Sequence, residues 1–150
     1  MSIQVIEGDL LSAAENIIAH QVNCRAKMAS GVAKVIRAKY PNAYLQYMEL
    51  FKNHRSESLL GRCQPVVIGE NKYVANLFGQ LNYGYGGEKY TNETALKMAL
   101  ISLKAFAVDN SLSVALPYKI GSDRGGADWN EVYKIIDEVF ADYEVTLYRL

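Results

Sequence analysis

Cysteine and histidine are scarce in this chain of 150 residues, which has only two of each. Cys24 and Cys63 lie far apart and form no C-x-x-C motif, so neither a disulfide framework nor a cysteine-based metal site is expected. A zinc site built on His20 and His54 would need an unusual set of further ligands. We therefore expect no bound metal and no resident cofactor.

A net charge and long apolar runs are also missing. The 16 Lys and Arg residues balance 16 Asp and Glu residues, which argues against a dedicated nucleic-acid partner. The charge is unevenly placed, because residues 25–62 are mainly basic and residues 123–144 mainly acidic, a pattern typical of solvated helix faces. No apolar run approaches the ~20 residues of a membrane span, and the N-terminus has no signal-like segment. We expect no membrane association and a reducing, cytoplasmic location.

Strand-like and helix-like segments alternate along the chain and indicate a single domain over residues 1–150. Short apolar runs predict strands at residues 3–7, 16–20, 64–69, 73–78, 113–117 and 145–150. Helical spacing predicts helices after Gly31 and after Pro41, one over residues 93–107, and a last one with Asp128 and Glu131 as a capping box. Continuous apolar strands need cover on both faces, and a short turn at residues 70–71 makes one strand pair antiparallel. The predicted fold class is α/β, a three-layer α/β/α domain with a mixed central sheet.

The apolar pattern also predicts which side chains face the core. In the first strand these are Ile3 and Val5, with Ile6 as a further candidate. The helix after Gly31 and the helix over residues 93–107 should each bury one apolar face. The residues of these faces are Val32, Val35, Ile36 and Tyr40 in the first helix, and Leu96, Leu100, Leu103 and Ala107 in the second.

Three strand ends carry small or polar residues, and ligands of open α/β sheets bind beyond the carboxyl ends of the strands. These segments are residues 8–10, residues 20–32, and the glycine-rich residues 118–129. The second and third each run into a helix, where backbone N–H groups and the helix dipole favour phosphate. The Rossmann fingerprint and the P-loop motif are both absent. Turns that require glycine are the alternative explanation of each loop, but two facing anion sites would suit a diphosphate.

Several motifs together resemble one known family. GDLL near the start, HQVNC followed by ASGVAKVIRAKYP, then ANLFGQ and ALPYKIGSDRGGADW are similar to the macrodomain family, in order and spacing, over residues 3–150. The branch that it resembles includes the yeast-type ADP-ribose-1″-phosphate phosphatase and the terminal ADP-ribose glycohydrolases. The resemblance implies an ADP-ribose pocket, with ADP-ribose, a derivative of it or a mono-ADP-ribosylated macromolecule as the partner. Macrodomains range from passive readers to hydrolases, so a non-catalytic module that binds ADP-ribose is the alternative function.

The resemblance also implies roles for individual residues. Asp9 would accept a hydrogen bond from the adenine amino group, Tyr148 would stack on adenine, and Asn23 would approach the distal ribose. The ligand-binding residues that it implies are Gly8, Asp9, Leu10, Gln21, Asn23, Ser30, Gly31, Val32, Gln80, Pro117, Ile120, Gly121, Ser122, Arg124, Gly125, Gly126 and Tyr148. Each of these residues also has a simpler interpretation. Asp9 alone is typical of a turn, and Tyr148 alone is typical of an edge strand. Gln80, Tyr83 and Tyr85 either form a rim over the distal ribose or pack as an ordinary loop.

The second loop departs from its relatives, because IGSDRGG places a carboxylate and a guanidinium where small residues are usual. Arg124 would clamp a phosphate or pair with Asp123.

Two residues are candidates for catalysis. His20 has a near-neutral pKa range and matches the histidine of the phosphatase branch, although a lone histidine at a strand end is more often structural. Asp123 is the second candidate, as an acid or a water-orienting group. Cys24 has no obvious activating base beyond His20 and is expected to be a small buried residue. The glycohydrolase branch uses a lysine and a loop aspartate. In this chain the segment that corresponds to the lysine, residues 78–80, contains no lysine, and the counterpart of the aspartate is Gly125. A lysine-linked mechanism is therefore not expected.

Overall fold

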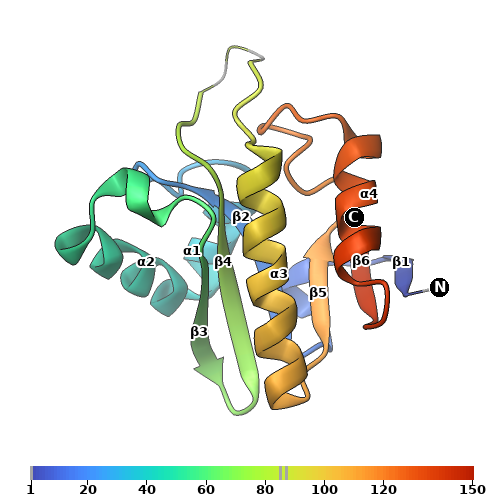
Figure 1. Cartoon of the computed structure of the whole chain (residues 1–150). Helices are drawn as coiled ribbons and strands as arrows, with labels where there is room; N and C mark the ends of the chain where they lie inside the picture. The colour runs from blue at the N-terminus through green and yellow to red at the C-terminus, as the bar shows by residue number, and fades with distance from the viewer. Residues whose placement is uncertain (1, 85, 87) are drawn as a thin grey trace.

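A computed structural model describes residues 2–84, 86 and 88–150 of the chain. These residues form six strands and four α-helices, in which α1 and α2 follow one another, as do β3 and β4 (Figure 1). The strands are β1 (Ile3–Glu7), β2 (Ile17–Asn23), β3 (Cys63–Gly69), β4 (Lys72–Gln80), β5 (Val114–Pro117) and β6 (Val145–Arg149). The helices are α1 (Gly31–Lys39), α2 (Pro41–Asn53), α3 (Glu93–Asn110) and α4 (Trp129–Val139), with short 3-10 turns at Leu10–Ser12 and Ser56–Leu59. Within the described residues, none of the helices combines the length and the apolar character that a membrane span requires.

The strands form one sheet in the order β1-β6-β5-β2-β4-β3. Four of its five strand pairs are parallel, and only the β3–β4 pair is antiparallel. The β3–β4 connection turns at Asn71, which adopts a positive φ of 50° that asparagine tolerates better than most residues. The predicted mixed sheet is confirmed.

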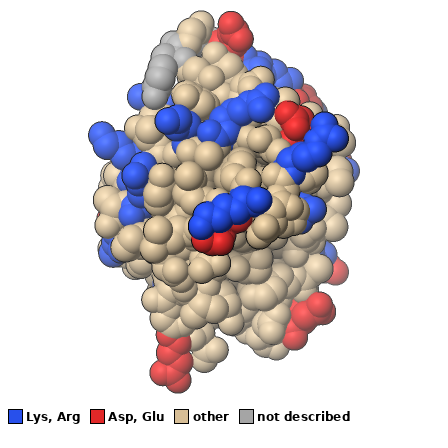
Figure 2. All heavy atoms as spheres, turned by 90° about the vertical axis from the view of Figure 1, so that its left-hand side faces the viewer, with Lys and Arg blue, Asp and Glu red and all other residues tan. Residues whose placement is uncertain are grey.

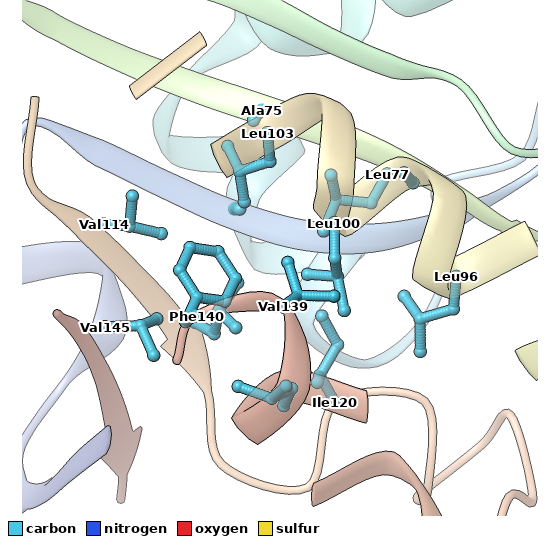
Figure 3. Packing of buried hydrophobic residues seen from close by; sticks show 14 of the residues in the cluster. Ala75, Leu77, Leu96, Leu100, Leu103, Val114, Ile120, Val139, Phe140 and Val145 are labelled. Carbon is cyan, nitrogen blue, oxygen red and sulfur yellow. The ribbon is translucent and has the colours of Figure 1, made fainter. Parts of the chain in front are cut away.

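Helices cover both faces of the sheet, which completes the predicted three layers (Figure 1). On one face α3 and α4 pack over a large core, which includes Leu96, Leu100 and Leu103 of α3 and Phe140, the C-cap residue of α4 (Figure 3). On the other face α1 and α2 cover two smaller clusters, around Ile36 and around Tyr47. Side chains therefore alternate along β2, with Ile17 on the α3 side and Ile18 on the α1 side.

The structure corrects several expectations about burial and boundaries. Val5 and Ile6 are 41% and 40% exposed on β1, which is an edge strand of the sheet. In α1, Val32 and Val35 are also exposed, and Ile36 alone is fully buried. β2 continues past His20 to Asn23, because β4 pairs with it along its whole length.

The predicted start of α4 is confirmed at Asp128, whose carboxylate accepts a hydrogen bond from the backbone N–H of Asn130. The predicted capping box is not formed: the Asp128 carboxylate caps Asn130, and the backbone N–H of Glu131 bonds to the backbone carbonyl of Asp128.

Candidate functional site

A hollow with a cavity volume of about 160 Å³ lies at the carboxyl ends of β2, β4 and β5. It is bordered by the end of β2, the entrance of α1, the loop after β4 and the loop after β5. The lining residues are His20, Gln21, Val22, Asn23, Lys27, Ala29, Ser30, Gly31, Val32, Ala33, Gln80, Tyr83, Gly84, Pro117, Tyr118, Lys119, Ile120, Gly121, Asp123, Arg124 and Gly125. Both candidate catalytic residues and most predicted ligand-binding residues thus meet in one place.

The loop after β5 approaches its neighbours so closely that it requires glycine. A Cβ on Gly125 would lie 2.2 Å from Thr91 Oγ1 and 2.5 Å from the carbonyl oxygen of Gly121. Gly121 has a positive φ of 75°, which side-chain-bearing residues rarely adopt. The glycines therefore bring the backbone of this loop to the edge of the hollow without obstruction by side chains.

The entrance of α1 forms the opposite border. Gly31 has a positive φ of 59°, and a Cβ placed there would meet no atom within 4 Å. Ser30 is the N-cap residue, but its side chain makes no capping hydrogen bond. Among the residues that the structure describes, the first backbone N–H groups of α1 therefore have no capping side chain, an arrangement that favours an anion.

The described residues that border the hollow include three cationic side chains, Lys27, Lys119 and Arg124, against one carboxylate, that of Asp123. Lys and Arg side chains also gather over the upper half of the neighbouring face, on the α2 side of the molecule (Figure 2). This positive balance adds to the backbone N–H groups and favours a negatively charged ligand such as a phosphate or diphosphate.

Gln21 connects three borders of the hollow. Its Nε2 donates to Gln80 Oε1 and to Thr91 Oγ1, both at 2.8 Å, and Thr91 Oγ1 donates to the carbonyl oxygen of Gly121. The Gly121 carbonyl can only accept, so the direction of these bonds is fixed. Gln21 Oε1 is left buried and without a hydrogen-bond partner among the described residues. Gln21 thus ties β2 to the loops after β4 and β5.

His20 is completely buried at the end of the apolar part of β2, although it borders the hollow. Its Nε2 lies 2.7 Å from Asn76 Oδ1 of β4, and its Nδ1 has no partner within the described chain. Burial lowers the pKa of His20 to about 4, and the hydrogen bond with Asn76 opposes this shift only in part. The imidazole is therefore neutral at pH 7.

Asn23 also borders the hollow, but most of its hydrogen bonds are internal. Its Nδ2 donates to the carbonyl oxygen of Lys27, and its Oδ1 accepts from the backbone N–H of Arg25 and from the hydroxyl of Tyr47. These bonds hold the loop after β2 in shape. This structural role was not part of the prediction for Asn23, which named only a contact with the ligand. The neighbouring Cys24 is buried, and burial raises the pKa of its thiol to about 11, in keeping with the expected structural role.

The residues predicted to contact adenine are not among those that line the hollow, although Tyr148 pairs with Pro117, which does line it. Asp9 is exposed and its Oδ1 accepts from the backbone N–H of Leu11, so it does act as a turn former. The ring of Tyr148 lies against Gly8, where an added Cβ would be 3.5 Å from it, and its hydroxyl donates to Glu15. Leu10 is buried beside them. Gly8, Asp9 and Tyr148 therefore form a separate cluster, at the ends of β1 and β6.

Three other predicted residues need separate mention. Ser122 and Gly126 belong to the loop after β5 but do not line the hollow. Tyr83 does line it, whereas Tyr85 lies outside the described residues.

Sequence reasoning missed several residues that build the site. Lys27, Tyr118 and Lys119 lie between predicted residues, and their positions in the flanking loops were the only signal. Thr91 and Asn76 carry no local signal, because their roles depend on contacts with distant segments. Across the described residues, we find no group of three or more His, Cys, Asp or Glu side chains arranged to hold a metal ion.

Comparison with known families decides the assignment: residues 19–136 match the model of the Macro domain family. The chain belongs to the macrodomain family. The resemblance noted from its sequence motifs is therefore confirmed. Two curated relatives are yeast proteins named ADP-ribose 1″-phosphate phosphatase. The protein of Saccharomyces cerevisiae (strain YJM789) is 26% identical and the match covers 99% of both chains; that of Lodderomyces elongisporus is 28% identical over 93% of each.

Solved macrodomain structures agree with this assignment. The macrodomain of Mycobacterium tuberculosis DarG superposes with a TM-score of 0.83 at 25% identity, over 99% of this chain and 97% of that one. A protein of unknown function from Bacteroides thetaiotaomicron gives a TM-score of 0.88 at 27% identity and covers 100% and 99% of the two chains. Thermosipho africanus DarTG, solved in complex with ADP-ribose, shares the fold at 15% identity and a TM-score of 0.79, with this chain spanning 41% of its length.

Proposed function

We propose that this macrodomain binds ADP-ribose in the hollow and hydrolyses ADP-ribose-1″-phosphate or a related ADP-ribose ester. One observation carries the proposal: two loops able to receive phosphate, at the entrance of α1 and after β5, face the same hollow as His20. The curated relatives named ADP-ribose 1″-phosphate phosphatase support the choice of substrate.

In this proposal the diphosphate lies between the backbone at Gly31 and the glycines at 121 and 125, where the surroundings are positively charged. The adenine extends toward Asp9 and Tyr148, and the distal ribose toward the end of β2. The ester bond would then lie near His20 and Asp123, which supply a neutral imidazole and a carboxylate for proton transfer.

The test separates binding from chemistry. Wild-type protein and the His20→Gln variant are titrated with ADP-ribose by calorimetry, and both are incubated with ADP-ribose-1″-phosphate while inorganic phosphate is measured. We expect similar affinity for ADP-ribose but phosphate release reduced by roughly 100-fold or more in the variant, the usual effect of removing an acid–base group. Full turnover by His20→Gln would refute the assignment of His20, and turnover lost only in Asp123→Asn would favour the second candidate.

A non-catalytic reader of ADP-ribose is the second candidate function, and the burial of His20 favours it. A histidine that is closed to solvent, with a pKa near 4, also fits a purely structural role in the sheet. In that case the calorimetric titration would show binding of ADP-ribose, whereas ADP-ribose-1″-phosphate and mono-ADP-ribosylated proteins would remain intact after long incubation.

A further inference from the structure

A chain of side-chain amides links His20 to helix α2. The direction of its hydrogen bonds is fixed where the chain meets two backbone carbonyls of α2. Gln64 Nε2 donates to the backbone carbonyl of Gln46 at 2.8 Å, so Gln64 Oε1 is the atom turned toward Asn76. Asn76 Nδ2 donates to that Oε1 at 3.0 Å and to the backbone carbonyl of Ala43 at 3.2 Å. Backbone carbonyls only accept hydrogen bonds, so neither amide can be reversed without loss of these contacts.

This direction determines where His20 carries its proton. With both Nδ2 hydrogens of Asn76 in use, its Oδ1 faces His20 Nε2 at 2.7 Å as an acceptor. His20 Nε2 must therefore bear the hydrogen, and because the imidazole is neutral, Nδ1 carries a lone pair. His20 and Asn76 are register partners on neighbouring parallel strands, so the sheet itself holds the two side chains together.

The other ring nitrogen of His20, Nδ1, lacks a hydrogen-bond partner among the described residues. Nδ1 of His20 is one of three buried side-chain atoms that have no hydrogen-bond partner in the described part of the chain. A buried acceptor in this state costs free energy unless water or a ligand donates to it. His20 is one of the residues that border the hollow, so a donor bound in the hollow is the candidate partner for Nδ1.

We propose that Nδ1 of His20 is the atom that accepts a proton from the reacting water, and that Asn76 is the positioning residue that keeps this nitrogen unprotonated. The inference rests on the proposed function for its chemical step and on the hydrogen-bond directions for the tautomer. Gln64 acts one step further out, because it fixes the orientation of Asn76 together with Ala43.

The step balances without a further reactant. The water oxygen bonds to phosphorus and loses one proton to His20 Nδ1, while the bond between phosphorus and the 1″ oxygen breaks. The 1″ oxygen takes a proton from solvent, and the imidazolium returns its proton to solvent. The products are ADP-ribose and inorganic phosphate.

The first test observes the ring nitrogens of ¹⁵N-histidine-labelled wild-type protein by NMR at mildly alkaline pH. We expect His20 to show a protonated Nε2 and an unprotonated Nδ1. His54 serves as an internal reference of the opposite kind, because its Nδ1 lies 3.0 Å from the carbonyl of Leu50, which can only accept. Addition of ADP-ribose should shift the His20 Nδ1 signal and leave Nε2 unchanged. A protonated Nδ1, or an Nδ1 signal that bound ADP-ribose does not move, would overturn the proposal.

The second test separates positioning from stability. Asn76→Leu removes the acceptor for Nε2–H, and Asn42→Ala is the control, since the Asn42 amide donates to the carbonyl of Val67 and not to a member of the His20–Asn76–Gln64 chain. For ADP-ribose-1″-phosphate we expect kcat to fall roughly tenfold or more in Asn76→Leu with KM within about threefold, and the single His20 tautomer to be lost. The control should match wild type in all three readouts.

Each result has a distinct meaning. Wild-type kcat in a folded Asn76→Leu variant would refute the role of Asn76. If Asn76→Leu does not fold, the wild-type NMR signals decide the tautomer by themselves. If the wild-type protein binds ADP-ribose but releases no phosphate, the proposed function fails, while the His20 signals still show whether Asn76 fixes the tautomer.

Discussion

Burial of the neutral His20 should make the unfolding free energy of this macrodomain decrease at acidic pH, and the substitution His20→Gln should remove this contribution. The pKa of His20 is lowered to about 4 in the folded protein, against 6.5 as the ordinary value that applies after unfolding. Above pH 6.5 the imidazole is neutral in both states, so its full contribution is present. Below it the unfolded chain binds a proton that the folded protein excludes, and the contribution is lost as the pH falls toward 4. Between about pH 7.5 and pH 5 this loss amounts to about 2 kcal/mol of unfolding free energy.

The assay compares wild type with His20→Gln, whose amide can still donate to Asn76 but does not titrate. Urea unfolding at several pH values gives the unfolding free energy of each protein. The carboxylates titrate in both proteins, so their contributions cancel in the comparison. Wild type should lose about 2 kcal/mol more than the variant between about pH 7.5 and pH 5. Equal losses in the two proteins would show that His20 is protonated without penalty, and that its burial does not keep it neutral.

Two further predictions follow from packing and from the thiols. Gly125→Ala places a Cβ 2.2 Å from Thr91 Oγ1, so the loop after β5 must move. We expect the unfolding free energy measured in urea to fall by about 1–3 kcal/mol and ADP-ribose binding to weaken. An unchanged urea midpoint and an unchanged affinity would contradict the close approach. Burial raises the pKa of Cys24 and Cys63 to about 11 and about 12, so a thiolate-directed reagent should label the folded protein slowly at neutral pH and the urea-unfolded protein quickly. Rapid labelling of Cys24 in the folded state would show that the cluster around Tyr47 opens more readily than the packing indicates.

Much of the fold was predictable because local signals agreed with each other. The alternation of apolar runs and helical spacing identified all six strands and four helices, and Asp128 marked the start of α4. The errors concern partners that the sequence does not reveal. Val5 looks like a core residue in isolation, yet it is exposed because β1 lies at the edge of the sheet.

The site was predictable only in part, and for a physical reason. Loops of small residues that open helices have a local signature, so the segments around Gly31 and Gly125 were recognised. The groups that hold the functional side chains in place have none. Asn76 lies 56 residues from His20 along the chain, and Thr91 lies 70 residues from Gln21, so their hydrogen bonds depend on the register of the folded sheet. Asn23 shows the reverse case, because a residue predicted to contact the ligand mainly closes its own loop.

The central claim is that a diphosphate lies against the entrance of α1, and calorimetric titration with ADP-ribose of a matched pair of variants tests it. Asn and Asp have nearly the same shape, tolerate the positive φ of Gly31, and would enter a space with no atom within 4 Å of the new Cβ. We expect wild type and Gly31→Asn to bind ADP-ribose with similar affinity. Gly31→Asp should bind roughly tenfold or more weakly, because its carboxylate would repel the phosphates. Equal affinities for the two variants, or no binding by wild type, would contradict the account.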